Sequence, residues 1–142
     1  MNYLADVNVW IALAVVGHVY HSTALAWFEE PQTSQILFSR VTQMGFLRLL
    51  TNRNVMGANV LSAADAWRVY ASLCDDDRVR YAEEPPHLED GWREAAMYFG
   101  AGPNFWTNAY LAAFAISGSR RLVTLDRGFR QFRGLEVDIL VR

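Results

Sequence analysis

Two aspartates in this 142-residue chain follow short apolar segments, one near each end of the sequence. Asp6 comes directly after Tyr3–Ala5, and Asp126 comes directly after Leu122–Leu125. Each segment is typical of a buried strand, and open α/β sheets place their chemistry outside the carboxyl ends of their strands. If both strands belong to one parallel sheet, the two carboxylates lie at the same edge. Paired carboxylates at such an edge suggest a site for a hard divalent cation.

Both aspartates also have a simpler interpretation, as helix caps. A short helix is expected through Trp10–Leu13 after Asp6, and another over Arg127–Phe132 after Asp126. Aspartate is favoured at the N-cap, where its side chain bonds the first amides of the helix. Capping and cation binding are compatible, and two such residues at matching strand ends favour a site.

The elements that must position these residues follow an alternating pattern. Strands separated by helices imply right-handed crossovers and a parallel sheet covered on both faces. We therefore predict an α/β fold, a three-layer α/β/α sandwich around a central parallel sheet of about five strands. Strands are expected over Tyr3–Asp6, Gln35–Ser39, Arg78–Ala82, Leu122–Leu125 and Val137–Val141, and further helices over Ser22–Glu30, Arg40–Thr51, Ser62–Leu73, His87–Phe99 and Asn108–Ser117.

Composition is that of one globular domain, residues 1–142, with 52% hydrophobic and 20% charged residues. The formal charge of −2 gives no overall attraction to nucleic acid, although all thirteen basic residues are Arg. The single cysteine, Cys74, excludes an internal disulfide framework. Neither a leader peptide nor a membrane-length apolar run is visible, so we expect a cytoplasmic protein without membrane contact.

Five motifs in order resemble the PIN-domain ribonucleases, and most closely the VapC toxins of bacterial toxin–antitoxin pairs. The resemblance runs nearly end to end, and it is the succession of motifs that makes it specific. The motifs are Leu4–Trp10, His18–His21, Val41–Asn52, Trp106–Ala113 and Thr124–Phe129.

The resemblance implies an activity and partners. PIN-domain toxins of this kind are endoribonucleases, hydrolases that cleave RNA phosphodiesters with Mg²⁺ or Mn²⁺. A cognate antitoxin protein silences them. The same resemblance implies a homodimer and, with the antitoxin, a higher toxin–antitoxin assembly.

The resemblance also assigns roles to individual residues. The four catalytic positions of the family fall on Asp6, Gln43, Asn108 and Asp126, and the metal ligands among them are Asp6, Asn108 and Asp126. Asn8, two positions after the first acid, and Thr107 are the supporting polar residues.

Two of these four positions carry amides where the family carries acids. Gln43 stands in place of the usual Glu and can position water without adding charge. Asn108 stands in place of an Asp that binds the metal directly, and it keeps the shape of that residue while losing its charge. Both a natural variant and an isosteric replacement of Asp fit such an Asn. We therefore expect a disarmed or attenuated enzyme, because losing a ligand charge should cost at least about 10–100-fold in affinity or activity.

Several other residues have both a functional and a simpler interpretation. Arg48, Arg127 and Arg130 could guide RNA phosphates, or could belong to a solvated face. His18 and His21 have ligand-like spacing, but no third His or Cys accompanies them, so a surface or helix-entry role is expected. Phe105 and Trp106 are expected in the core or an interface, with base stacking as the alternative.

Two further functions compete with the nuclease. A non-catalytic RNA- or protein-binding module with a PIN-like fold would keep the architecture and lose the metal. A sugar- or nucleotide-binding domain is disfavoured, because no Gly-rich phosphate loop follows any predicted strand.

Overall fold

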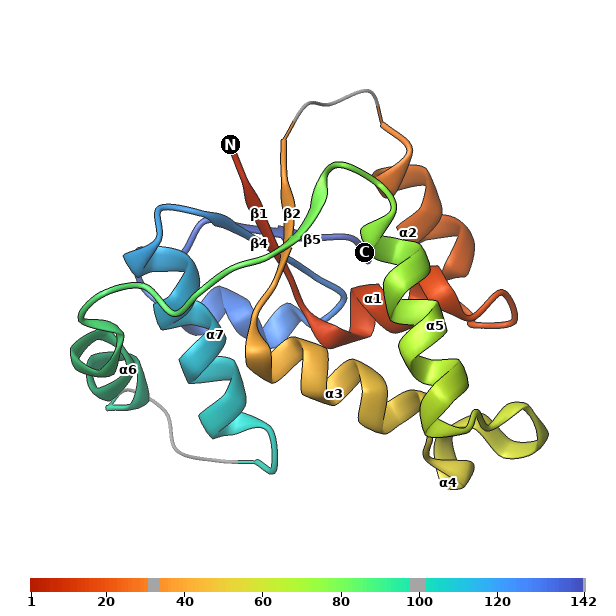
Figure 1. Ribbon diagram of the computed structural model, residues 1–142. Helices are drawn as coiled ribbons and strands as arrows, with labels where there is room; N and C mark the ends of the chain where they lie inside the picture. The colour runs from red at the N-terminus through yellow and green to blue at the C-terminus, as the bar shows by residue number, and fades with distance from the viewer. Residues whose placement is uncertain (31–33, 98–101, 142) are drawn as a thin grey trace.

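A parallel sheet of five strands forms the centre of the computed structural model, which describes residues 1–30, 34–97 and 102–141 (Figure 1). The strand order is β3-β2-β1-β4-β5, and every neighbouring pair is parallel. The strands are β1 (Tyr3–Ala5), β2 (Ile36–Phe38), β3 (Val79–Tyr81), β4 (Arg121–Thr124) and β5 (Val137–Ile139).

Helices cover both faces of the sheet. In Figure 1, α6 and α7 lie on one side of the strands, whereas α1, α2 and α5 lie on the other. The predicted three-layer α/β/α sandwich is therefore confirmed. The helices are α1 (Val7–Ala14), α2 (His21–Phe28), α3 (Arg40–Leu50), α4 (Arg53–Met56), α5 (Ala63–Cys74), α6 (Leu88–Ala96) and α7 (Phe105–Ser117), with the 3-10 helices η1 (Gly57–Asn59) and η2 (Arg127–Gln131).

The two layers of the core follow from the alternation of side chains along each strand. Leu4, Leu37 and Leu122 point to one face, where they pack in a cluster with the apolar residues of α7. Their strand neighbours Phe38 and Val123 point to the other face and pack in a second cluster with residues of α1, α3 and α5. Buried apolar side chains on both faces explain why the strands read as continuous apolar runs.

The pairing of β1 with β4 brings the start of the chain beside a segment near its end. Leu4 lies opposite Leu122, and Ala5 lies opposite Val123. Because the strands are parallel, the residues that follow them leave the sheet at the same edge.

Most helix boundaries agree with the predicted ranges, but two regions differ. The 53–59 segment, to which the sequence pattern assigned no element, forms α4 and η1. Asn52, expected to end α3, also caps α4, because its Oδ1 accepts a hydrogen bond from the backbone N–H of Asn54 at 2.9 Å. Helix α7 begins at Phe105 and not at Asn108. Asn108 therefore lies within the helix, and its position on the helix surface is fixed by the turn before it. The predicted helix over His87–Phe99 extends beyond the described residues.

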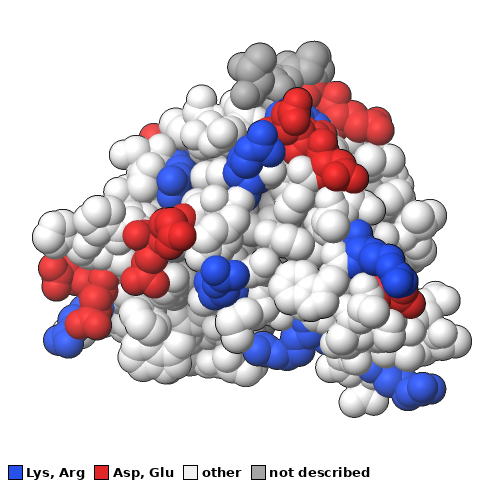
Figure 2. Space-filling view, viewed as in Figure 1, with Lys and Arg blue, Asp and Glu red and all other residues white. Residues whose placement is uncertain are grey.

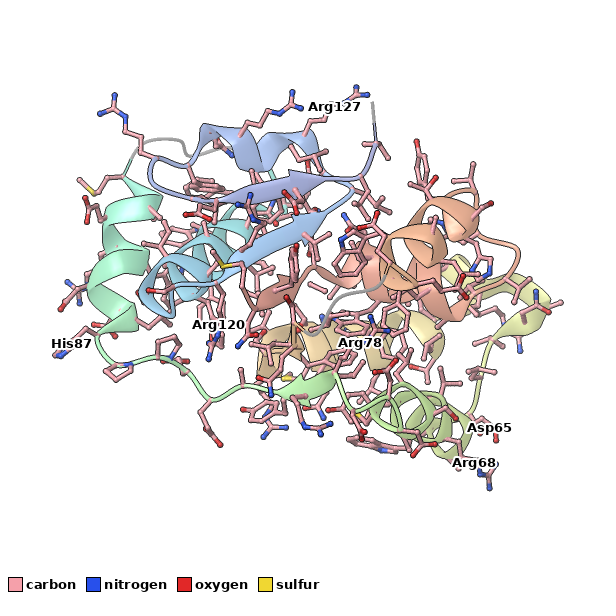
Figure 3. The ribbon with its side chains drawn as sticks, turned by 90° about the horizontal axis from the view of Figure 1, so that it is seen from above. Asp65, Arg68, Arg78, His87, Arg120 and Arg127 are labelled. Atoms are coloured by element: carbon pink, nitrogen blue, oxygen red, sulfur yellow. The ribbon has the colours of Figure 1, made fainter. Side chains whose placement is uncertain are left out.

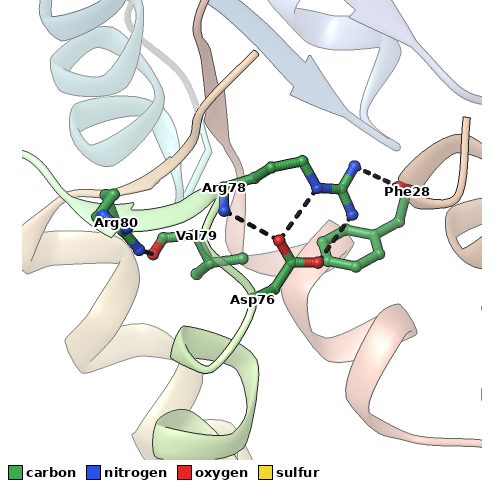
Figure 4. Close-up of polar contacts among 5 residues, drawn as sticks. All are labelled: Phe28, Asp76, Arg78, Val79 and Arg80. Atoms are coloured by element: carbon green, nitrogen blue, oxygen red, sulfur yellow. Dashed lines mark hydrogen bonds and ion pairs between the residues drawn. The ribbon is translucent and has the colours of Figure 1, made fainter. Parts of the chain in front are cut away.

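The turn between α5 and β3 carries three consecutive aspartates and is more than a solvated loop. Asp76 accepts hydrogen bonds from the Arg78 guanidinium at 3.1 and 2.9 Å, and these bonds lower the pKa of the Asp76 carboxyl. The same guanidinium donates to the Phe28 carbonyl oxygen at 2.8 Å and lies 4.5 Å from the centroid of the Phe28 ring (Figure 4). Arg78 thus fastens the start of β3 to the end of α2.

Among the helices of the described residues, none is long and apolar enough to cross a membrane.

Candidate active site

A pocket of about 510 Å³ opens at the carboxyl edge of the sheet. Its walls come from six parts of the chain: the β1–α1 junction, the loop after α1, α3, α4, the start of α7 and the segment that follows β4. The lining residues are Asp6, Val7, Asn8, Ile11, His18, Val41, Gly45, Arg48, Leu49, Val55, Asn104, Thr107, Asn108 and Asp126. The structure thus brings five of the predicted polar residues to one pocket, namely Asp6, Asn8, Thr107, Asn108 and Asp126.

The buried hydroxyl of Thr124, the last residue of β4, joins the two strand ends. Thr124 Oγ1 donates a hydrogen bond to Asp6 Oδ2 at 2.8 Å and accepts one from the backbone N–H of Asp126 at 3.0 Å. It also accepts a longer bond from the Asn8 amide at 3.4 Å. Asn8 Oδ1 in turn accepts from the backbone N–H of Leu125 at 3.1 Å. The strand ends are therefore held together by side chains as well as by the sheet.

Both aspartates cap the helices that follow them. Asp6 Oδ1 accepts a hydrogen bond from the backbone N–H of Val7 at 2.8 Å, at the start of α1. Asp126 Oδ1 accepts one from the backbone N–H of Gly128 at 2.8 Å, at the start of η2. These bonds fix the orientation of both carboxylates. Each carboxylate thus has the capping geometry and also lines the pocket.

Burial makes the Asp6 carboxyl a weaker acid than an exposed aspartate. Its side chain is 8% exposed. Loss of hydration raises the pKa of the Asp6 carboxyl from 3.8 to about 6, against the opposing effect of its hydrogen bonds to Thr124 and Val7. The negative charge of Asp126 makes a smaller contribution to this increase in the pKa. A buried carboxylate beside a second carboxylate is an environment that a cation would stabilise.

Helix α7 brings Asn108 to the second aspartate. Asn108 Nδ2 donates a long hydrogen bond of 3.4 Å to Asp126 Oδ2. Asn104, one turn before Asn108, and Thr107, the residue just before it, also line the pocket. The Asn108 amide can donate a hydrogen bond to Asp126, whereas a carboxylate at position 108 would repel the Asp126 carboxylate.

Helix α3 forms a wall of the pocket that carries no carboxylate. The residues that line the pocket are Val41, Gly45, Arg48 and Leu49, whose spacing defines one face of a helix. Gly45 leaves room for the first residue of α1, because a Cβ there would lie only 2.8 Å from Val7 Cγ2. Among these positions only Arg48 is charged.

Gln43 lies on the opposite face of α3 and is not among the lining residues. Its Oε1 accepts a hydrogen bond from the Arg40 guanidinium, and its side chain also interacts with the Tyr70 hydroxyl. The side chain is 7% exposed. The structure therefore does not bring Gln43 to the two aspartates, and the α3 residue that faces the pocket near this level is Gly45.

The donor set fits one hard cation with few protein ligands. Mg²⁺ takes one or two carboxylates and completes its shell with water and phosphate oxygens. Asp6 and Asp126 can supply the carboxylates, and the Asn108 amide can supply a neutral oxygen if it is turned around. Within residues 1–30, 34–97 and 102–141, no group of three or more His, Cys, Asp or Glu side chains could hold a metal ion.

The predicted RNA-contacting residues divide into two groups. Arg48 lines the pocket, whereas Arg127 and Arg130 are exposed on η2 and are not among the lining residues. Figure 3 shows Arg127 at the outer margin of the molecule, with its side chain extending away from it. Trp106 is 64% exposed and packs edge to face against Trp92 of α6, with ring centroids 6.3 Å apart. It lies outside the pocket lining.

Two polar residues of this region were not predicted from the sequence. Thr124 was read only as part of a strand, although its place two residues before Asp126 put it at the strand end. Asn104 immediately precedes α7, and the sequence pattern assigned it to no element. A polar residue at the last position of a buried strand is the signal that could have identified Thr124.

Comparison with known proteins agrees with this fold. The sequence matches the PIN domain family over residues 3–135, and the chain belongs to that family. It is 44% identical to Ribonuclease VapC41 of Mycobacterium tuberculosis over 144 aligned positions, which cover 98% of this chain and 99% of the relative.

Two solved structures share the architecture at low sequence identity. VapBC2 from Rickettsia felis, bound to a DNA fragment from its promoter, superposes with a TM-score of 0.71 at 12% identity, covering 98% of each chain. VapC20 of Mycobacterium tuberculosis, a sarcin–ricin loop cleaving toxin, superposes with a TM-score of 0.65 at 18% identity, covering 94% of this chain and 98% of the other.

Proposed function

We propose that this protein is a VapC-type toxin, an endoribonuclease that hydrolyses RNA phosphodiesters with a divalent cation. The observation that carries the proposal is the meeting of Asp6 and Asp126 in one pocket of a PIN fold. The 44% identity to a relative named as a ribonuclease supports it.

The residues of the pocket have distinct tasks in this proposal. Mg²⁺ or Mn²⁺, when bound, would activate a water molecule and stabilise charge on the phosphate and leaving oxygen. Asp6 and Asp126 would hold the cation, and Thr124 keeps the Asp6 carboxylate in place. Asn8 supports the same strand ends, and Thr107 offers a hydroxyl at the rim. Arg48 contributes positive charge for an RNA phosphate.

We further propose that Asn108 attenuates this activity. A neutral ligand weakens cation binding relative to a carboxylate, and the Asn108 amide satisfies Asp126 without a cation. Gln43 takes no direct part, since it lies away from the pocket lining.

Substituting Asn108→Asp tests both statements. We expect Mn²⁺-dependent cleavage of total bacterial RNA to rise on the order of 10–100-fold. The matched control is Asn104→Asp, which adds the same charge at the exposed rim of the same pocket and should change cleavage far less. Adding Asp126→Asn to Asn108→Asp should remove the gain. No cleavage in Asn108→Asp, with the fold intact, would refute the nuclease assignment.

A non-catalytic binding module is the second candidate, and the Asn108–Asp126 hydrogen bond favours it, because that bond needs no cation. Titration with Mn²⁺ by calorimetry separates the two. Saturable binding that is lost in Asp126→Asn supports the enzyme, whereas no binding in the parent protein supports the module.

We also propose that a cognate antitoxin protein binds this chain in the cytoplasm. In this proposal the chain forms a homodimer, which can enter a larger toxin–antitoxin assembly. The first structural neighbour, VapBC2, is such a complex by its name. On this chain, Trp67 of α5 is 53% exposed and lies edge to face against Tyr70, which provides an apolar surface for an amphipathic helix.

A further inference from the structure

The pocket at the strand ends continues past one wall into a second, smaller hollow, which we name the side hollow. The side hollow has a volume of about 240 Å³ and shares Ile11, His18 and Val55 with the pocket. Its remaining lining residues come from the end of α1, the loop after it, α4 and η1. They are Val15, Gly17, Met56 and Asn59. Together the two spaces form a groove from the aspartates to η1.

We propose that the side hollow binds a base of single-stranded RNA, that of the nucleotide next to the phosphate that a cation at Asp6 and Asp126 would hold. This assignment rests on the proposed function. A base has apolar faces and a polar edge. Val15 and Met56 provide apolar surface, and the Asn59 amide can both donate to and accept from the edge of a base. The side hollow therefore offers both kinds of contact that a base requires.

Charge on the surrounding surface favours a polyanion as the occupant. Among the described residues that line the side hollow, none is acidic. Arg48 lines the neighbouring pocket, and Arg53 begins α4. Figure 2 shows basic side chains below α3 and over α4, whereas acidic side chains gather near the α5–β3 turn and over α6. Neutralisation of backbone phosphates dominates affinity for nucleic acids.

His18 stands at the junction of the two spaces and can contact the linking phosphate. The backbone N–H of Tyr20 donates a hydrogen bond to His18 Nδ1 at 3.0 Å. Since Nδ1 accepts this bond, the neutral ring carries its proton on Nε2. The ring thus offers Nε2–H as a donor for a phosphate oxygen between the two nucleotides.

Gly17→Leu is the variant that tests the side hollow most directly. No heavy atom lies within 4 Å of a Cβ built on Gly17, and its φ is outside the left-handed region. A leucine side chain can therefore enter the hollow without strain in the fold. The matched control is Val16→Leu in the same loop, because Val16 is 79% exposed and lines neither space.

The readout is the affinity for short fluorescein-labelled oligoadenylate, oligocytidylate and oligouridylate, measured by anisotropy in Ca²⁺, a hard cation that takes carboxylate oxygens as ligands. We expect Gly17→Leu to weaken binding about tenfold, the loss of about 1.4 kcal/mol of base contact. Val16→Leu should change affinity less than about twofold. Asn59→Ala should reduce the differences among the three oligomers, whereas His18→Ala should weaken all three alike.

The possible outcomes separate this proposal from the proposed function. Equal affinities of the parent and Gly17→Leu, with the fold verified by circular dichroism, would overturn the side-hollow assignment. It would also be overturned if Gly17→Leu weakened antitoxin binding and left RNA binding intact. In both cases RNA cleavage by Asn108→Asp still decides the proposed function. Failure of the parent protein to bind any of the three oligomers would overturn the assignment directly, and absent cleavage would then overturn the nuclease as well.

Discussion

The strand-end wall of the pocket (Asp6, Asn8, Asp126) and its helical wall (the pocket-facing residues of α3, with Asn108) differ in how their polar groups are held. At the strand ends, the Thr124 hydroxyl and the helix N-termini fix each carboxylate through bonds of 2.8 Å. On the helical wall, Asn108 makes one bond of 3.4 Å.

The two walls therefore differ in two properties: how firmly their polar groups are held before a ligand binds, and which charges they carry. The strand-end wall supplies both carboxylates and orients them before any ligand arrives. The helical wall contributes a guanidinium and an amide, but no acid. A single substitution on the helical wall can therefore change the charge of the pocket, whereas a substitution at the strand ends also changes the stability of the fold.

The largest expected effect comes from Asp6, whose burial is costly without a cation. A carboxyl with a pKa of about 6 in the folded protein and 3.8 in the unfolded chain is destabilising once ionised. The penalty is absent below about pH 4, grows as the pH rises to about 6, and is then on the order of 3 kcal/mol. Asp6→Asn should therefore raise the free energy of unfolding at pH 7 in EDTA by up to that amount.

Urea denaturation at pH 4 and pH 7 checks this prediction. The stabilisation should be present at about pH 7 and nearly absent at about pH 4. Asp77→Asn, at an exposed position in the α5–β3 turn, is the control and should change stability by less than about 0.5 kcal/mol. If Asp6→Asn stabilises the protein equally at both pH values, ionisation of the buried Asp6 carboxyl is not the cause of the effect.

The next largest effect concerns the hydroxyl that joins the two strand ends. Thr124→Val keeps the shape of the side chain and leaves Asp6 Oδ2 and the Asp126 N–H without this partner. It should lower the free energy of unfolding by about 2 kcal/mol. Thr124→Ser keeps the hydroxyl and loses one methyl group, so it should cost only about 1 kcal/mol. If the Thr124→Val variant is as stable as the parent protein in urea denaturation, the hydroxyl does not hold the strand ends together.

The smallest effect tests the orientation of α3. Gln43→Glu adds a carboxylate on the face turned away from the pocket, beside Arg40. The affinity for Mn²⁺, measured by calorimetry, should change less than about twofold, in contrast to at least about tenfold for Asn108→Asp. Comparable gains in the two variants would show that Gln43 reaches the cation.

The fold could be predicted because its signals are local. Apolar strands, caps such as Ser62 before α5, and the alternation of elements each appear within a few residues. The positions of Asp6 and Asp126 followed from the same signals, since each ends an apolar strand. Asn52 shows the limit of local signals, because one residue both follows α3 and caps α4.

The helical wall could not be predicted in the same way. Val41 and Leu49 face the pocket, whereas Phe46 and Leu50 face the core, so α3 has apolar residues on two sides. Its rotation relative to the sheet is decided by tertiary packing, and the turn of Gln43 away from the pocket depends on that rotation. Thr124 was missed for a related reason, because its partner Asp6 lies 118 positions away in the chain.

The pairing of β1 with β4 has a consequence for biosynthesis. Asp6 leaves the ribosome well before Thr124, which completes the pocket 118 positions later in the chain. A nascent chain that stops before β4 lacks the second acid and the hydroxyl that bridges to it. Premature termination therefore leaves the proposed cation site with only one of its two carboxylates.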